Sequence, residues 1–462
     1  PPKPRSPPLH SIPMQPPAFL NVQFLVSALT IVVIIHVILV GVVGCIYAER
    51  KISAYIQDRI GPNRVGFDFG LPFLQKLFRG FGFWGLGQAL ADGLKFIFKE
   101  DFTPKGADKI LFTLAPMAAV TPALIGFAII PWGGIWHAPD ITLPLIGWTL
   151  EGGNVIVAGA PVNVGIIFLL AVASLGVYGI TLGGWASNNK YSFLGGLRCS
   201  AQMISYEIPM GLALLSVLLV VGTLLPNEIV KWQADHGWLI FAQPLAAGIF
   251  FIAALAEANR LPFDNAEAEQ ELVGGYHTEY SSMRFALFFL AEYAHVITSS
   301  AFFALLFLGG YHLPFIGALS PDAVGLGAVF AKVAVYLLKV TLLIGFIMVI
   351  RWTIPRLRFD QVMQVAWQAV IPMGLVILVS TAVMVYFEQR SLLPLLGMNI
   401  VLAAIMLAVQ PMLPRSTRNR KVRLAGSRFS PLEGEVGDTR PTLPLALEDR
   451  PMEGTAQVFA AR

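Results

Sequence analysis

Nine long apolar stretches, separated by short polar segments, constrain the fold of this chain more than any other feature. Each has about the ~20 residues that a helix needs to cross the hydrocarbon core of a bilayer. Hydrophobic residues make up 56% of the chain and the mean hydropathy is +0.68, values far from those of soluble domains. The sequence therefore predicts an all-α integral membrane protein with about nine transmembrane helices. The stretches are residues 20–47, 111–132, 163–185, 205–224, 238–256, 283–308, 326–350, 368–387 and 393–412.

The distribution of Lys and Arg predicts the orientation of these helices. If the first long loop faces the cytoplasm or the mitochondrial matrix, 26 of the 32 basic residues lie on inner segments, as the positive-inside rule requires. The N-terminus then lies outside and the basic stretch 415–423 lies inside. This topology needs an odd number of spans, which favours a ninth helix although that stretch contains Pro394 and Asn399. The net charge of +4 follows from the same topology and gives no case for nucleic-acid binding.

The sequence outside the apolar stretches divides the chain into three parts. Residues 1–18 form a flexible Pro-rich extension, residues 19–412 the transmembrane helical domain, and residues 413–462 a tail that is first basic and then poorly ordered. The two cysteines, Cys45 and Cys199, are too few for a four-thiolate iron–sulfur or zinc site. We expect both to be small buried residues, and we expect no metal site.

The first inner loop, AERKISAYIQDRIGPNRVG at 48–66, predicts an amphipathic helix at the membrane interface. Ile52, Tyr55, Ile56 and Ile60 recur with helical spacing, and charged or polar residues fill the other positions. The turn Gly61-Pro62-Asn63 then ends the helix. A second interfacial helix is predicted at 84–100. Contact with lipid headgroups explains the basic residues of this loop, but a rigid Gly-Pro turn beside an arginine also suits the entrance of a fixed cavity.

An acid within an apolar stretch marks the second inner motif, SAQMISYEIPMGLAL at 200–214. Glu207 lies at the beginning of the predicted span, and a carboxylate in that position is costly unless it has a function. Pro209 removes a helical hydrogen bond and can admit water. The alternative is that Glu207 merely caps the start of a helix.

The third inner motif is strongly acidic: EANRLPFDNAEAEQELVGGYHTEY at 257–280 has six carboxylates and one base, Arg260. Carboxylates this close do not all keep their ordinary pKa values, because like charges and burial both raise them. If 265–272 is helical, Glu267 and Glu271 share a face; if it is extended, Glu269 joins them on one side. Either way at least two carboxylates should meet. A hydrated acidic surface is the alternative, but it cannot explain Glu292 inside the next span.

A fourth inner segment, RWTIPRLRFDQVMQVAW at 351–367, clusters Arg351, Arg356, Arg358 and Asp360. Three interpretations remain open for this cluster: a membrane anchor, a surface for a partner, or an ion-pair network with the acidic motif. Lys339 is a further lone base, inside the seventh predicted span.

Together these motifs resemble a membrane subunit of respiratory complex I (NADH:quinone oxidoreductase), known as the H subunit in bacteria and as subunit 1 in mitochondria. The similarity is carried by AERKISAYIQDRIGPNRVG, SYEIP, the acidic motif followed by FALFFLAEY, and RWTIPRLRFDQ, in this order over about residues 20–390. It implies eight core transmembrane helices, so the ninth helix and both chain ends exceed the family pattern.

The resemblance implies that the chain forms the membrane part of a quinone-binding chamber and couples quinone reduction to proton pumping. In the chamber it places Arg50, Lys51, Arg59, Arg64 and Asp264. The charge path toward the pumping subunits would comprise Glu207, Glu257, Arg260, Glu267, Glu269, Glu271, Glu279 and Glu292. No redox centre is expected in this chain alone, so its part in the enzyme is that of one component of a proton translocase.

The resemblance also implies the cofactors, partners and location. Quinone, expected to be ubiquinone, is the substrate, while FMN and iron–sulfur clusters are expected in partner subunits. The partners would be the peripheral-arm quinone-site and iron–sulfur subunits, the adjacent small membrane subunits, and lipids. The membrane would be the bacterial cytoplasmic membrane, with the mitochondrial inner membrane as the alternative.

Two other functions compete with this interpretation. The first is the homologous component of a membrane-bound hydrogenase, which would not depend on quinone. The second is a free-standing proton-coupled transporter, but no inverted repeat is visible and the acids gather on one side of the membrane rather than at its middle.

Overall fold

The computed structural model describes residues 21–66, 73, 76, 82–143, 148–267, 269–314 and 316–409. The predicted Pro-rich extension (1–18) and the predicted tail (413–462) lie outside the described residues. Within the described part nearly all regular structure is helical, and eight helices are long and apolar enough to cross a membrane. The predicted all-α membrane fold is therefore confirmed, and the chain is a multi-pass membrane protein.

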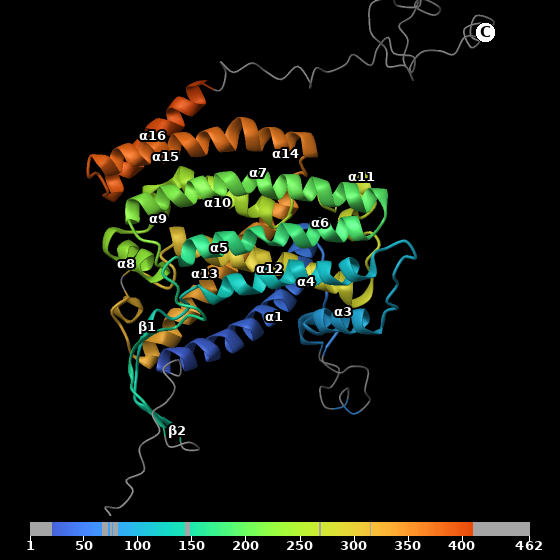
Figure 1. Cartoon of the computed structure of the whole chain (residues 1–462), viewed down its shortest axis with the longest axis horizontal. Coiled ribbons are helices and arrows are strands. Elements are labelled where there is room, and N and C mark those ends of the chain that lie inside the picture. The colour runs from blue at the N-terminus through green and yellow to red at the C-terminus, as the bar shows by residue number, and fades with distance from the viewer. Residues whose placement is uncertain are drawn as a thin grey trace, which may run out of the picture. The chain divides into compact units, whose positions relative to one another are not determined.

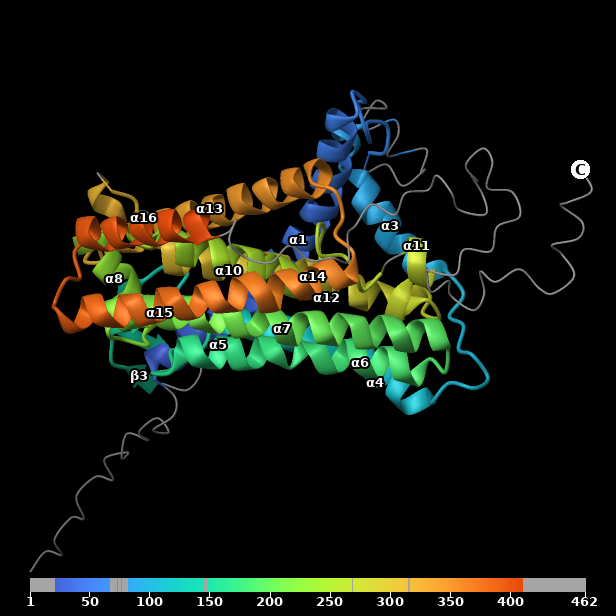
Figure 2. The same cartoon turned by 90° about the horizontal axis from the view of Figure 1, so that it is seen from above.

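Each of the nine predicted stretches coincides with a helix or a pair of consecutive helices. Eight have the length of a span, and the fifth is an apolar helix of 14 residues, α10, preceded by the short α9. Their bounds are α1 Val22–Ile56, α4 Lys109–Ile125 with a 3-10 turn to Ala128, α5 Gly165–Ser174 with α6 Gly176–Ala186, α7 Lys190–Val221, α9 Leu239–Ala242 with α10 Pro244–Glu257, α12 Ser282–Phe307, α13 Leu326–Thr353, α14 Phe359–Val365 with α15 Ile371–Tyr386, and α16 Leu392–Val409. Figures 1 and 2 show α5, α6, α7 and α15 side by side.

The prediction of a separate interfacial helix within 48–66 is wrong in the limits that it gives to the helix. Residues 48–56 continue α1, which runs without interruption for 35 residues, or about 52 Å at 1.5 Å per residue. No proline occurs between residues 22 and 56, so nothing in this segment forces the helix to end. A helix of this length exceeds the ~30 Å hydrocarbon core. Its last turns therefore occupy the interfacial position that the prediction gave to a separate helix. The second predicted interfacial helix is present as α3, Gly87–Phe98.

Helix α7 also begins earlier than predicted, and this changes the position of Glu207. The helix starts at Lys190, with Asn189 as its N-cap, and continues through Pro209 to Val221. Glu207 thus lies in the middle of a 32-residue helix, which rules out the alternative that it caps a helix start. Residues 190–204 include polar side chains that interrupt the apolar stretch but do not interrupt the helix. Hydropathy alone therefore did not reveal the first part of α7.

The end of the helices opposite the acidic motif carries four short strands that the sequence analysis did not predict (Figure 1). Strand β1 (Ile135–Ala138) pairs antiparallel with β4 (Gly153–Ile156), and β2 (Ile141–Leu143) pairs antiparallel with β3 (Trp148–Leu150). A further helix, α8 (Pro226–His236), lies between α7 and α9. Strands of three or four residues are too short to give a recognisable alternation of polar and apolar residues.

Helix α12 lies at the centre of the packing, and 78% of an apolar stretch of 18 residues within it is buried inside the protein. It contacts α1, α3, α4, α10 and α13. Small residues bring its neighbours close together: a Cβ at Gly179 of α6 would lie 2.4 Å from the backbone nitrogen of Ala119 in α4. Close backbone approach at small residues is the usual way in which helices pack in membranes.

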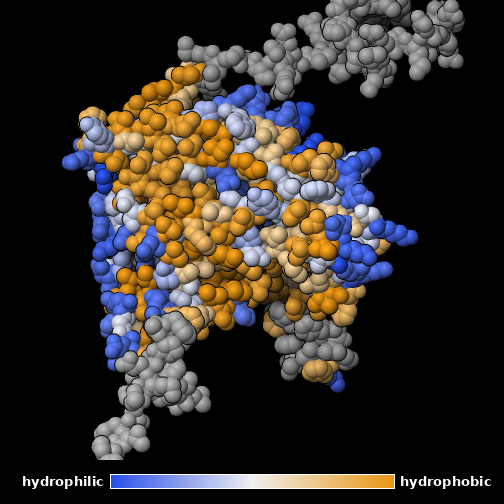
Figure 3. Space-filling view, in the orientation of Figure 1, coloured by the Kyte–Doolittle hydropathy of each residue, from blue (hydrophilic) through white to orange (hydrophobic). Residues whose placement is uncertain are grey.

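The outer surface of the helices is apolar between two polar ends, as Figure 3 shows for one face. On α7 the exposed apolar residues follow the helical repeat and are Leu197, Ile204, Ile208, Leu215 and Leu219. A band of this kind is expected where helices face lipid or a neighbouring subunit. The acidic motif lies at one polar end and the strands lie at the other (Figure 1).

Candidate functional site

The acidic motif is fixed against α7 by one buried glutamine. The side-chain nitrogen of Gln202 donates hydrogen bonds to the carbonyl oxygens of Ala256 (2.8 Å) and Phe263 (2.7 Å). Its side-chain oxygen accepts a hydrogen bond of 3.0 Å from Asn265. Both ends of the amide are therefore used, and the segment that carries Asp264 is held in one position rather than left as a solvated loop.

Two carboxyl groups of this loop have opposite pKa shifts. Burial and the negative charge of Glu267 raise the pKa of Asp264 to about 6. Burial also opposes the charge of Glu267, but the hydrogen bond and the charge of His277, whose Nε2 lies 3.3 Å from Oε1 of Glu267, outweigh it and lower the pKa. For His277, burial would lower the pKa, but the same pairing raises it. The loop can therefore exchange protons near neutral pH through neighbouring groups that titrate together.

Glu292 of α12 is joined to the loop by two side chains, Arg260 and Tyr276. Nη2 of Arg260 lies 3.5 Å from one carboxylate oxygen, and both side chains are about nine-tenths buried or more (6% and 7% exposed). The hydroxyl of Tyr276 donates a hydrogen bond of 2.9 Å to the other oxygen. The guanidinium of Arg260 also lies 4.1 Å from the ring centre of Tyr293. Burial disfavours the charge of Arg260, but the surrounding carboxylates, Glu292 first, raise its pKa.

The network continues to the inner ends of α1 and α13. Glu49 forms an ion pair of 2.5 Å with Arg351, and its other oxygen accepts a hydrogen bond of 2.5 Å from the hydroxyl of Tyr293. Because Tyr293 also contacts Arg260, charged groups from α1, α12, α13 and the acidic loop are in continuous contact. Glu49 was not among the predicted site residues.

Glu267 and Glu271, which we expected to meet, are instead paired with different cations. Only residues 269–272 form a helix, α11, so neither the helical nor the extended alternative for 265–272 is correct. Glu271 contacts Arg198 of α7 at 2.5 Å and Arg356 at 3.7 Å, whereas Glu267 contacts His277. Glu269 is exposed in α11. Pairing each acid with its own cation costs less than holding two like charges together.

The arginine cluster of 351–367 is divided in the same way. Arg351 and Arg356 pair with acids, but the side chains of Arg358 and Asp360 are exposed. The backbone N–H of Arg358 donates a hydrogen bond to the side-chain oxygen of Gln361 and begins α14. The backbone N–H of Leu357 donates to the carbonyl oxygen of Pro262, so this segment lies directly on the acidic loop.

Two further acids lie deeper in the helices. Glu207 accepts a very short hydrogen bond from the hydroxyl of Ser174 at the end of α5. Glu257, the last residue of α10, lies within range of the charge of Glu207. A small cavity separates Glu257 from Glu292, and both residues line it.

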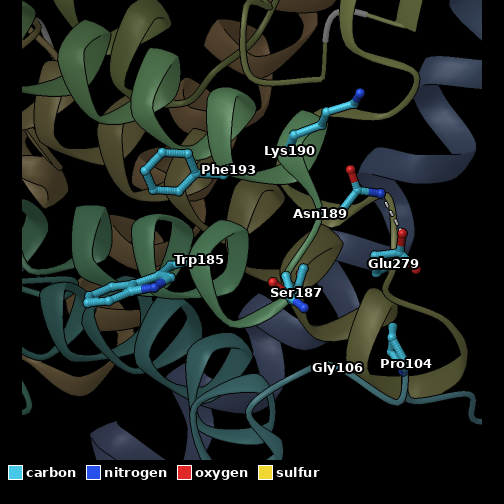
Figure 4. Close-up of a pocket in the computed structure, with 9 residues that line it drawn as sticks. Pro104, Gly106, Trp185, Ser187, Asn189, Lys190, Phe193 and Glu279 are labelled. Atoms are coloured by element: carbon cyan, nitrogen blue, oxygen red, sulfur yellow. Dashed lines mark hydrogen bonds between the residues drawn. The ribbon is translucent and has the colours of Figure 1, made fainter.

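The last acid of the motif, Glu279, borders a different hollow, an open cleft of ≈ 740 Å³ at the inner end of α6 and α7 (Figure 4). Its carboxylate accepts a hydrogen bond of 2.6 Å from the side chain of Asn189, the N-cap of α7. Figure 4 shows Lys190 pointing away from this pair, and Trp185 and Phe193 on the opposite side. The structure thus places Glu279 apart from the contacts that join Arg260 and Tyr276 to Glu292.

The basic residues of the first inner loop differ in their surroundings. Arg50 forms a 2.6 Å ion pair with Asp92 of α3, and the ammonium of Lys51, which is buried, donates to the carbonyl oxygen of Ile60 (3.1 Å). Arg59 and Arg64 are exposed and form no ion pair within the described residues. The loop itself is tightly held, since a Cβ at Gly85 (φ +81°) would lie 2.4 Å from the carbonyl oxygen of Pro62.

Several buried polar atoms of the network have no hydrogen-bond partner within the part of the chain that the structure describes. They include atoms of Arg260, Asp264, Arg351 and Arg356. Arginine N–H groups are donors that a quinone carbonyl can accept from, and a carboxyl group can exchange a proton with a hydroxyl. Among the described residues, no group of three or more His, Cys, Asp or Glu is placed to hold a metal ion.

Comparison with known proteins identifies the family. A family model described as NADH dehydrogenase matches residues 29–382, which is more than three-quarters of the chain. The chain belongs to this family. One relative is the first of the H subunits of NADH-quinone oxidoreductase in Geobacter sulfurreducens, 44% identical over 361 residues (78% of this chain, 94% of the relative). The corresponding H subunit of Cytophaga hutchinsonii is 42% identical over 364 residues (78% and 97%), and that of Leptospira biflexa is 44% identical over 357 residues (76% and 93%).

The family resemblance seen in the motifs is thus confirmed, but several side chains of the network were missed in the sequence. Tyr276 and His277 lie within the acidic motif, where two titratable side chains among carboxylates could have been recognised. Glu49 precedes Arg50 in the first motif, and Tyr293 and His295 follow Glu292 on α12. Only the fold shows that these residues meet.

Proposed function

We propose that this chain is the membrane subunit of a proton-translocating NADH:quinone oxidoreductase. It would form the membrane part of the quinone-binding chamber and couple quinone reduction to proton pumping through buried carboxylates. The observation that carries this proposal is the continuous set of charge contacts from Glu49 and Arg351, through Tyr293 and Arg260, to Glu292 inside a span. The names of the relatives support a quinone enzyme rather than a hydrogenase.

In this proposal the inner ends of α1, α3 and α13 and the acidic loop surround the quinone headgroup. Arg50, Lys51, Arg59 and Arg64 lie toward the entrance, where the first two are held by Asp92 and the carbonyl oxygen of Ile60. Asp264 lies further in and exchanges a proton when the quinone takes up two electrons and two protons. Its pKa of about 6 allows both protonation states to be populated near neutral pH.

The charge path then leads from Asp264 through the paired acids into the helices. A proton gained or lost at Asp264 changes the charge felt by Glu267, and Glu267 in turn acts on Glu292. Arg260 stands between the loop and Glu292, and Glu257 and Glu207 continue the path. Glu269, Glu271 and Glu279 remain part of the proposal, but their exposed or separate positions favour a role at the surface toward partners.

The remaining parts of the enzyme belong to partner subunits. We propose that FMN and the iron–sulfur clusters are held by the peripheral arm, that ubiquinone is the substrate, and that adjacent small membrane subunits receive the charge. The exposed Arg358 and Asp360, beside the acidic loop, would face such a partner. Because the three relatives described above are bacterial, we propose the bacterial cytoplasmic membrane as the location.

The experiment replaces Glu267 by Gln in the assembled complex. The variant removes the charge that holds His277 and acts on Asp264, so we expect NADH:quinone turnover and pumping to fall at least tenfold. NADH oxidation by an artificial acceptor should survive, because that reaction uses only the partner subunits. Glu271→Gln should have a smaller effect of the same kind.

Glu100→Gln provides the matched control, because Glu100 is an exposed acid of an inner loop. It should behave like the unmodified complex in all three assays. Undiminished quinone turnover and pumping in both Glu267→Gln and Glu271→Gln would refute the proposed path.

A further inference from the structure

A cavity within the helices separates the two groups of buried acids. It is lined by residues of α4, α6, α7, α10 and α12 and of the acidic loop. The room for water is ≈ 10 Å³, at the lower limit of the about 10–15 Å³ that one molecule needs. Glu292, Tyr276 and Glu257 all line it, so the cavity offers a proton a route from Glu292 to Glu257.

The remaining titratable residue of the cavity is His295. It lies three residues after Glu292 on α12, so both side chains point from the same face of the helix. Within the described residues the side chain of His295, which is partly buried, makes no hydrogen bond or ion pair, so both ring nitrogens are available to a group or a water in the cavity.

The position of the imidazole ring is set by a glycine. Gly176 begins α6 directly after the break at Leu175, and a Cβ at this glycine would lie only 3.1 Å from Nε2 of His295. The ring therefore packs edge-on against the joint between α5 and α6. Ser174, two residues earlier at the end of α5, donates the hydrogen bond to Glu207. His295 thus lines the cavity together with Glu292 and Glu257, and its ring lies against the joint beside which Ser174 binds Glu207.

We propose that His295 carries protons across this cavity, from Glu292 on one side to Glu257 and Glu207 on the other. The inference rests on the proposed function and adds a residue that is not an acid to its path. A neutral imidazole has one nitrogen that accepts a proton and one that donates. It takes a proton from the carboxyl group of Glu292 and releases the proton of its other nitrogen to the carboxylate of Glu257, directly or through one water.

Imidazole suits this step because one ring nitrogen takes up a proton while the other releases one, so the ring is neutral before and after the transfer. Tyr276, the other titratable lining group apart from the two acids, has a pKa that burial and the charge of Glu292 raise well above its ordinary value. It donates its proton to the hydrogen bond with Glu292. The charged and titratable groups that face His295 are therefore Glu292 of its own helix, Glu257 of α10 and Tyr276 of the loop, while the lining residues of α4, α6 and α7 carry no charge.

The test uses His295→Gln in the assembled complex in membranes. Glutamine can still form hydrogen bonds in the cavity but cannot take up a proton at neutral pH. We expect normal assembly and normal NADH oxidation by an artificial acceptor, at least a tenfold loss of quinone-linked proton pumping, and loss of one ionisation from the pH profile of pumping. Ser299→Ala, one turn further along α12 and outside the cavity lining, should change none of these.

A second variant tests the position of the ring without removing it. Gly176→Ala places a methyl group against Nε2 and should reduce pumping in the same direction as His295→Gln, with the imidazole still present. Gly248→Ala on α10 is its matched control, because a Cβ there meets nothing within 4 Å. If His295→Gln does not assemble, a Gly176→Ala variant with normal pumping and pH profile overturns the inference.

The results distinguish the proposed role of His295, the relay, from the proposed path of buried carboxylates as a whole. If His295→Gln pumps normally and keeps the full pH profile while Glu267→Gln is impaired, the role of His295 is refuted and the proposed function stands. If both variants are normal, both proposals fail. Impaired pumping with a lost ionisation in His295→Gln, together with a normal Ser299→Ala, supports the relay.

Discussion

Lys339, the lone base of α13, gives the most direct test of how this fold is held together. Its ammonium donates hydrogen bonds to the carbonyl oxygens of Leu308 (2.6 Å), Gly310 (2.8 Å) and His312 (2.6 Å). These oxygens lie just after the end of α12, where carbonyl groups lack helical partners. The cation also lies 4.7 Å from the ring centre of Trp238. Lys339 thus fixes the outer end of the helix that carries Glu292 and His295.

Replacing Lys339 by Met keeps the length of the side chain and removes the three donors. Each carbonyl oxygen left without a partner costs about 1–3 kcal/mol, and the variant regains part of this because no ammonium needs to be buried. We expect a net loss of about 3 kcal/mol, which changes the ratio of folded to unfolded chain more than a hundredfold. The assays are the amount of assembled complex in membranes and the temperature at which heating destroys quinone reductase activity.

Two other lysines provide the matched controls. Lys332→Met, also in α13, removes one short bond, to the carbonyl oxygen of Ala323 (2.6 Å), and one of 3.4 Å to Pro321, so its effect should be smaller. Lys190→Met removes an exposed cation and should have almost none. If Lys339→Met assembles in normal amounts and resists heat like Lys190→Met, the three hydrogen bonds do not hold the end of α12.

Two pH-dependent predictions concern the acidic loop. Asp264→Asn removes a carboxyl group whose pKa is about 6, so the fall in quinone-linked turnover as the pH drops below that value should disappear; an unchanged profile would contradict the role of Asp264. His277→Gln breaks the ion pair with Glu267, whose stabilisation requires a charged histidine and a charged glutamate. The ion pair stabilises the fold fully at pH values below the ordinary histidine pKa of about 6.5 and above the ordinary glutamate pKa of about 4.5. This stabilisation is lost as the pH rises through the raised pKa of His277. The variant should therefore lose more heat resistance near pH 6 than near pH 9. An equal loss at both pH values would count against the ion pair.

The helices could be predicted from the sequence because each apolar stretch must satisfy its own backbone within the membrane. Their ends could not be predicted in the same way. α1 and α7 both extend through polar residues that contain no helix breaker, so hydropathy placed the end of α1 too early and the start of α7 too late. The break between α9 and α10 at Gln243 was also missed, although Pro244 follows it.

The candidate site was predicted less completely than the fold. Acids in apolar or crowded surroundings stand out in a sequence, so Glu207, Glu267 and Glu292 were found. The cations and hydroxyl groups that surround them do not stand out, because Tyr276 and Arg351 become partners only when segments far apart in the chain are packed together. Arg351 of α13 meets Glu49 of α1 across about 300 positions of sequence, and no spacing rule connects them.

The acids of this site differ in what compensates their charge, and this difference bears on how a proton could move. Glu49, Glu267, Glu271 and Glu292 each have a cation beside them. Glu207 and Glu257 have no cation beside them within the described residues; Glu207 has Ser174 instead.

A buried carboxylate without a cation is costly unless a proton neutralises it. The proposed path therefore passes from acids that have cations beside them to acids that have none. In this path a change in charge at the loop is passed among the acids and cations of the first group, and a proton leaves that group at Glu292. To reach Glu257 and Glu207 the change must become a proton transfer, because no cation is present to compensate. In the path that we propose, this transfer takes place between Glu292 and Glu257, where the cavity and His295 are found.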